Sequence, residues 1–197
     1  MATKEYFRRF LSRRQPLKEE MTSSTTHYQT PISPRDGEHI RFWRDSPAHT
    51  GRYLHAVDII IPDPEIQPLP VFAPQSGIVI DLIQNHRIWG PNPEYLHFLN
   101  YITVEVIPEF EFYQLCHIGF NSCVKKDGSL IQIGDTISQG QIIAATGANG
   151  FMTDKRHLHF MTGRWTNKLR EDFHSIPINW IPGTLESPIN YDQTLNR

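Results

Sequence analysis

Short apolar runs separated by turn-forming residues recur along most of the chain. Several of these runs alternate polar with apolar positions, which is typical of β-strands that place one face on a core. The segments 75–77 (QSG) and 134–140 (GDTISQG) predict tight turns between neighbouring antiparallel strands. We therefore expect a mainly β fold, a single antiparallel sheet or sandwich domain with few helices, with strands in the runs 55–62, 69–84, 100–107, 112–119, 135–147, 157–163 and 176–181.

Two regions do not follow this pattern. Residues 1–30 are basic and then Ser/Thr-rich, so we expect a leader and linker there, partly helical or disordered, ahead of a domain formed by residues 31–197. Within the leader, EYFRRFL (5–11) fits a frayed segment better than a basic amphipathic helix that touches a membrane or partner. Residues 85–100 are punctuated by Pro and Gly and predict a long loop, of the kind that often borders a binding groove.

Composition narrows the classes of function. The 197 residues carry a net charge of −2, so there is no overall field that would attract nucleic acid or an anionic membrane. No stretch approaches the ~20 apolar residues that span a bilayer, and no signal-peptide core is visible. We therefore expect no nucleic-acid partner and no transmembrane segment. Location is cytoplasmic by default, with the cell envelope as the place of action if the chain is exported or released, and the oligomeric state stays open.

The two cysteines, Cys116 and Cys123, exclude a disulfide-built scaffold. A single bridge closing the short loop between them is possible. We favour two reduced thiols, because free cysteines often pack as small apolar groups.

The segment HLHF (157–160) places two histidines one residue apart in an apolar run. On a strand His157 and His159 would project from the same face, where two protonated rings would repel each other. A metal ion removes this problem because it binds neutral imidazole. Asp58 also lies inside an apolar run, where a carboxylate is rare unless it is paired or coordinated. Asp58 and one histidine of the pair are therefore candidate zinc ligands, and the second histidine and His117 are candidates to act on a water beside the metal.

These motifs, taken in order, resemble the lysostaphin/LytM-type zinc endopeptidases that cut peptidoglycan peptides. The resemblance covers roughly residues 45–180. After the Asp-bearing run come LPVFAPQSGIV (69–79), LCHI (115–118), GDTISQGQIIAATG (Gly134–Gly147) and the unchanged family motif HLHF. Several ordered motifs at compatible spacing are more specific than any one of them.

The resemblance implies the β fold of this family, with its duplicated hybrid motif, and a Zn²⁺ cofactor. It implies that Asp58 and His159 bind the zinc, and that His117 and His157 orient the attacking water and stabilise the tetrahedral intermediate. The implied activity is that of a metalloendopeptidase acting on peptide bonds in peptidoglycan stem or cross-bridge peptides. The alternative is an inactive relative that binds a wall peptide or activates a partner hydrolase.

The remaining metal ligand departs from the family pattern, in which a histidine stands four residues before the aspartate. Leu54 occupies that position here. His55 stands three residues before Asp58 and would face the opposite way on a regular strand, unless a bulge corrects it. His49 lies nine residues before Asp58, and LasA-like relatives have extra residues between these two ligands. We favour His49 and keep His55 as the alternative. If neither reaches the metal, the domain is a non-cleaving relative.

Overall fold

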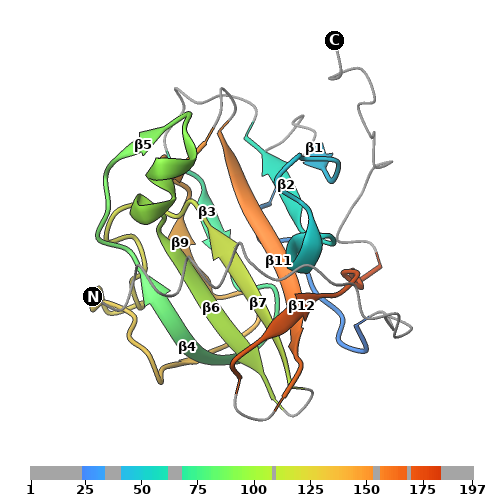
Figure 1. The fold of residues 1–197 in the computed structure, drawn as a ribbon. Coiled ribbons are helices and arrows are strands. Elements are labelled where there is room, and N and C mark those ends of the chain that lie inside the picture. The colour runs from blue at the N-terminus through green and yellow to red at the C-terminus, as the bar shows by residue number, and fades with distance from the viewer. Residues whose placement is uncertain are drawn as a thin grey trace.

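The computed structural model describes residues 24–33, 41–61, 68–107, 110–152, 156–167 and 170–182, which form a mainly antiparallel β structure. One large sheet crosses the molecule (Figure 1). Its main path runs in the order β1-β2-β11-β7-β6-β4-β8, and β12 pairs with the C-terminal end of β11. The strands of this sheet are β1 (Arg41–Trp43), β2 (Val57–Ile60), β4 (Gly77–Ile83), β6 (Tyr101–Val106), β7 (Glu111–Cys116), β8 (Thr136–Ile137), β11 (His157–Trp165) and β12 (Phe173–Ser175).

Two small strand pairs stand outside this sheet. β3 (Pro70–Phe72) pairs antiparallel with β9 (Ile142–Ala145), and β5 (Trp89–Gly90) pairs parallel with β10 (Gly150–Phe151). The expected antiparallel, mainly β domain is thus confirmed, while the β5–β10 pair and the isolated bridge between Tyr28 and Trp180 are parallel.

Helical structure in the described residues consists of two 3-10 segments, η1 (Gly51–Tyr53) and η2 (Pro93–Phe98). The prediction of few helices is confirmed. The segment 85–100, which we expected to be irregular, contains the short strand β5 and then η2. None of the helices in the described ranges is long and apolar enough to cross a membrane.

The two faces of the large sheet differ because side chains alternate along each strand. On β11, Leu158 and Phe160 belong to the main core, whereas His157 and His159 lie on the other face together with Asp58 of β2. The alternation seen in the sequence thus separates a packed apolar face from a face that carries titratable groups. The core on the first face includes Val57, Ile59, Val71, Val79, Ile102, Val104, Tyr113, Leu115, Ile137, Ile143, Leu158 and Phe160.

The segment 24–33 packs against the domain. Tyr28 is fully buried in the main core, and its backbone N–H donates to the carbonyl of Asn179. The hydroxyls of Ser24 and Tyr28 both donate to the buried carboxylate of Glu111. Division of the chain at residue 30 stays a prediction, because residues 1–23 lie outside the described part.

Both cysteines are free and buried, at the end of β7 and in the loop after it. The expectation of two reduced thiols therefore agrees with the structure. Burial raises the pKa of the Cys123 thiol to about 12 and also raises that of Cys116.

Candidate metal centre

Asp58 and His159 meet because β2 and β11 are adjacent antiparallel strands. In the register of this pair His159 stands directly opposite Asp58. Cross-strand partners place their side chains on the same face of the sheet, within reach of each other. The distance between Nδ1 of His159 and Oδ1 of Asp58 is 2.9 Å.

His49 reaches the same carboxylate from a loop. It lies in the connection between β1 and η1, where its backbone N–H donates to the carbonyl of Ser46. Its Nδ1 donates to the carbonyl of Arg44 over 2.9 Å, and its Nε2 lies 3.1 Å from Oδ1 of Asp58. A histidine that donates one ring N–H to a carbonyl and aims the other nitrogen inward has the usual arrangement of a metal ligand.

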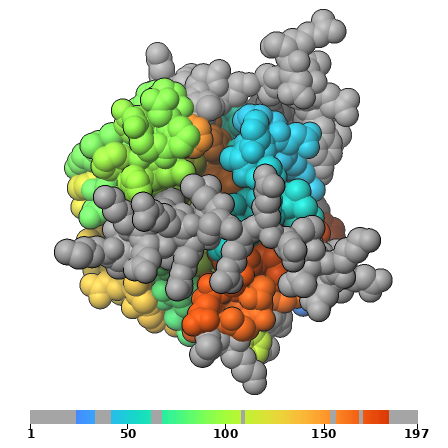
Figure 2. All heavy atoms as spheres, viewed as in Figure 1, coloured from blue at the N-terminus to red at the C-terminus, as the bar shows by residue number. Residues whose placement is uncertain are grey.

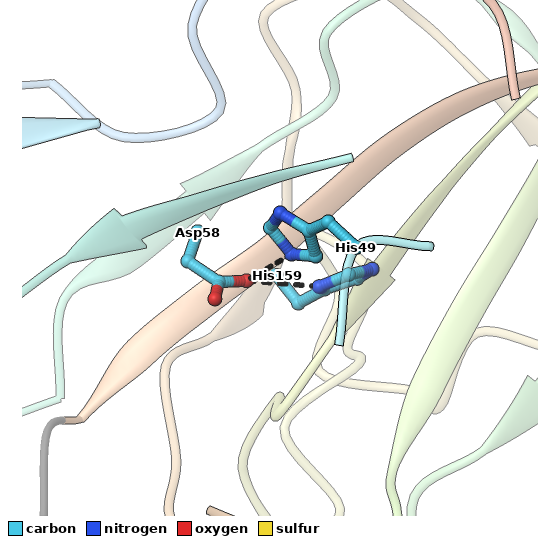
Figure 3. Close-up of side chains that lie close together, drawn as sticks. All are labelled: His49, Asp58 and His159. Atoms are coloured by element: carbon cyan, nitrogen blue, oxygen red, sulfur yellow. Dashed lines mark hydrogen bonds and ion pairs between the residues drawn. The ribbon is translucent and has the colours of Figure 1, made fainter. Parts of the chain in front are cut away.

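The side chains of His49, Asp58 and His159 therefore converge on one point, as Figure 3 shows. One potential ligand atom from each of them lies within 4.8 Å of the other two. His49 and Asp58 are buried and His159 is half-buried. Two imidazole nitrogens and one carboxylate oxygen form a donor set that suits zinc.

The pKa values at this centre follow from its burial and its contacts. Burial alone would raise the pKa of Asp58, but hydrogen bonds from His159 and His49 and the charge of His157 hold it well below its ordinary value. Burial would lower the pKa of His49, but its hydrogen bond with Asp58 and the charge of that carboxylate raise it above the ordinary value. At His159 the effect of burial is larger than that of the hydrogen bond and charge of Asp58, so the pKa of His159 is lowered.

These contacts show how a cation fits the site. Both neighbours of His49, the Arg44 carbonyl and the Asp58 carboxylate, are hydrogen-bond acceptors, so without a metal the ring must carry two protons to satisfy them. A divalent cation would replace the inner proton and relieve the crowding of two ring nitrogens on a single carboxylate oxygen. The residues present therefore fit a metal ion.

The two remaining histidines lie beside this group. Nε2 of His157 is 3.6 Å from Oδ1 of Asp58, and the rings of His117 and His157 stand edge to face with centroids 4.6 Å apart. His117 comes directly after β7, the strand that pairs with β11 on the side away from β2. Four histidines and one aspartate from different parts of the chain are thus gathered on this face of the sheet.

His117 would point to the other face if β7 continued regularly, because Cys116 stands opposite His159 and the next residue alternates. Instead His117 adopts a left-handed backbone conformation with φ +64°. Non-glycine residues rarely adopt this conformation, and it is often found at functional sites. Burial and the charges of His157 and His159 lower the pKa of His117 to about 3, although its hydrogen bond with Asn149 acts in the opposite direction.

His55 does not join the group. It lies between η1 and β2, which begins only at Val57, and its backbone N–H donates to Oγ of Ser175. Burial lowers its pKa, and the positive charges of Arg44 and His174 act in the same direction. Among the described residues, the group that could hold a metal ion consists of His49, Asp58 and His159.

The sequence does not reveal the groups that hold these histidines. The Arg44 carbonyl orients His49, and the Asn149 carbonyl accepts from Nδ1 of His117 at 2.8 Å. Backbone carbonyls have no signature in a sequence. The one available signal was Asn149 in GANG, a polar residue that proves to be almost fully buried.

In Figure 2 orange atoms of the segment that contains β10 and β11 are recessed between two raised groups of atoms, the green segment that contains β5 and η2 and the cyan segment that contains β1 and η1.

Neither a protein-family model nor a curated protein matches this sequence. Several solved structures are similar to it in fold. The M23 metalloprotease pseudoalterin, from the deep sea, is 13% identical over 71% of each chain, with a TM-score of 0.46. A structure described as a LytM glycyl-glycine endopeptidase from Ruminococcus gnavus is 16% identical over 77% of this chain and 56% of its own, with a TM-score of 0.49.

The catalytic domain of the antimicrobial peptidase lysostaphin from Staphylococcus simulans is 18% identical over 71% of this chain and 79% of its own, with a TM-score of 0.39. At identities below 25% and TM-scores below 0.5, these likenesses carry no functional conclusion. The function of this chain has to follow from its own side chains.

Proposed function

We propose that this protein is a zinc-dependent endopeptidase that hydrolyses peptide bonds in peptidoglycan stem or cross-bridge peptides. The observation that carries the proposal is the convergence of His49 Nε2, Asp58 Oδ1 and His159 Nδ1 on one point, with His117 and His157 beside them. The motifs of the chain, which resemble those of lysostaphin/LytM-type enzymes, support the choice of peptidoglycan as substrate.

His49, Asp58 and His159 would hold the zinc. Three protein ligands leave a coordination position for water or substrate, which is typical of catalytic rather than structural zinc sites. Bound there, zinc would polarise an amide carbonyl and lower the pKa of water.

His117 and His157 would assist proton transfer and stabilise charge during hydrolysis. The carbonyl of Asn149 accepts a hydrogen bond from Nδ1–H of His117. Nε2 is therefore the nitrogen that is available to exchange a proton or form a hydrogen bond with a reacting group. His157 stands between His117 and Asp58, which suits it to orient water or to stabilise negative charge on the carbonyl oxygen. General acid–base assistance of this kind contributes about 10²–10⁴ in rate.

The alternative function is an inactive domain that binds a wall peptide. Such a domain needs neither three converging ligand atoms nor two additional histidines. The presence of all five groups on one face of the sheet favours the enzyme.

Hydrolysis is the direct test. Purified protein loaded with zinc should release new amino groups from peptidoglycan or from a glycine-rich cross-bridge peptide, and 1,10-phenanthroline should stop the release. Asp58→Asn serves as the matched control, since it keeps the shape of the side chain and removes the charge that a metal ion needs. Zinc-loaded protein that binds these substrates without cutting them would instead support the binding domain.

A further inference from the structure

We propose that Asn100 and Asn149 are positioning residues, which hold His117 in its left-handed conformation with the proton on Nδ1 and thereby present Nε2 to the substrate. Neither residue contacts the three candidate metal ligands through a hydrogen bond that the structure shows. This inference rests on the proposed function only in taking His117 to act on the substrate.

The backbone and ring of His117 are both tied to the two asparagines. The N–H of His117 donates to the carbonyl of Asn100 at 2.9 Å, and Nδ1 donates to the carbonyl of Asn149 at 2.8 Å. The carbonyl of His117 in turn accepts from the N–H of Gly147 at 2.8 Å. A strained backbone conformation persists only where its surroundings hold it, and these three bonds provide the hold.

The side chains of the two asparagines lock these carbonyls in place. Oδ1 of Asn149 accepts from the N–H of Asn100 at 2.7 Å, and Nδ2 of Asn149 donates to the carbonyl of Ile118 at 2.5 Å. Asn100 makes a matching set of bonds, with Nδ2 donating to the carbonyls of His86 and Ile118 and Oδ1 accepting from the N–H of His86. Each amide uses both its donor and its acceptor, and both residues are at most 1% exposed.

The position of the pair in the fold explains why it controls His117. Asn100 stands directly before β6, and the register of β6 with β7 places it opposite His117, where the regular strand pairing stops. Asn149 stands directly before β10, on a separate segment. The two amides therefore form hydrogen bonds at the point where the strand pairing ends, and they connect three chain segments around one imidazole.

Asn149→Asp and Asn100→Asp test the proposal because each keeps the size of the side chain and replaces the amide donor by a carboxylate oxygen. That oxygen would face the Ile118 carbonyl that the amide now binds, leaving two acceptors in contact. Asn179→Asp is the matched control: Nδ2 of Asn179 also donates to a carbonyl, that of Ser24, and no hydrogen bond connects Asn179 to His117 in the described structure.

Two readouts separate positioning from simple loss of stability. In zinc-loaded protein, two-bond 1H–15N correlation spectra should show His117 as the Nδ1–H tautomer, and Asn149→Asp should shift it towards a mixture. With zinc content and KM within about twofold of wild type, kcat should fall at least about tenfold in both site variants and stay within about twofold in Asn179→Asp.

An Nε2–H tautomer of His117 in the wild type would overturn the proposal, and so would site variants whose kcat matches that of Asn179→Asp. If Asn149→Asp does not fold, the tautomer in the wild-type spectrum and the kcat of Asn100→Asp decide whether the proposal holds. If the wild type cuts no peptide, the proposed function fails, while the tautomer and its response to Asn149→Asp still decide this inference.

Discussion

Asp58 and His159 stand directly opposite each other on β2 and β11, with Oδ1 of the carboxylate 2.9 Å from Nδ1 of the imidazole. Any slip of the β2–β11 register by one residue would send the two side chains to opposite faces of the sheet. The strand pairing that builds the core therefore also builds the candidate metal centre.

The first prediction concerns the third ligand. His49→Ala should reduce bound zinc from about one per chain to a small fraction, because two protein ligands hold zinc far more weakly than three. His55→Ala should leave zinc content unchanged, since that side chain lies outside the converging group. Metal analysis of the dialysed proteins measures both. Loss of zinc in His55→Ala with retention in His49→Ala would reverse the assignment.

The second prediction concerns the two histidines beside the metal group. His117→Ala and His157→Ala should keep zinc, because neither removes a candidate metal ligand. Their kcat should fall by a factor of about 10²–10⁴, because each loses a group that transfers protons or stabilises charge. The exposed His27 offers a control, and His27→Ala should leave kcat unchanged. Full activity in either site variant would remove that histidine from the mechanism.

Much of this site could be predicted from the sequence, because strand alternation is a local property. The spacing of His157 and His159 already placed these two side chains on one face, and the apolar surroundings of Asp58 marked it as a candidate ligand. The preference for His49 over His55 relied partly on a strand that would include residue 55. The strand begins at Val57, so His55 lies in the turn before it and the argument from strand alternation does not apply to this residue.

Other features could not be predicted, because they depend on contacts between distant segments. The expected strand 112–119 stops at Cys116, where His117 takes its left-handed conformation. That conformation is held by Asn100 and Asn149, which are distant in sequence. No local pattern encodes such contacts.

The third prediction concerns the thiols. Cys116 and Cys123 should not react with Ellman's reagent at about pH 8 in the folded protein, because both are buried and their pKa values are raised. Both should react once the chain is unfolded in guanidinium. Rapid reaction of the folded protein, or no reaction after unfolding, would contradict the burial or the free state of these thiols.

The fourth prediction concerns the buried Glu111, whose carboxylate accepts from Arg164 at 2.6 Å. Arg164→Ala should lower the free energy of unfolding by about 3–5 kcal/mol, because it leaves a buried charge without its cation. Lys125→Ala removes the partly exposed ion pair with Asp135 and should cost less than about 1 kcal/mol. Urea unfolding curves measure both, and equal losses would show that burial of Glu111 does not matter.

A crystal structure of the zinc-soaked protein, with anomalous data collected on both sides of the zinc absorption edge, would show directly whether this site binds zinc. We expect one strong zinc peak within coordination distance of His49 Nε2, an Asp58 carboxylate oxygen and His159 Nδ1. A peak bound through His55, or no peak between Asp58 and His159, would contradict this expectation.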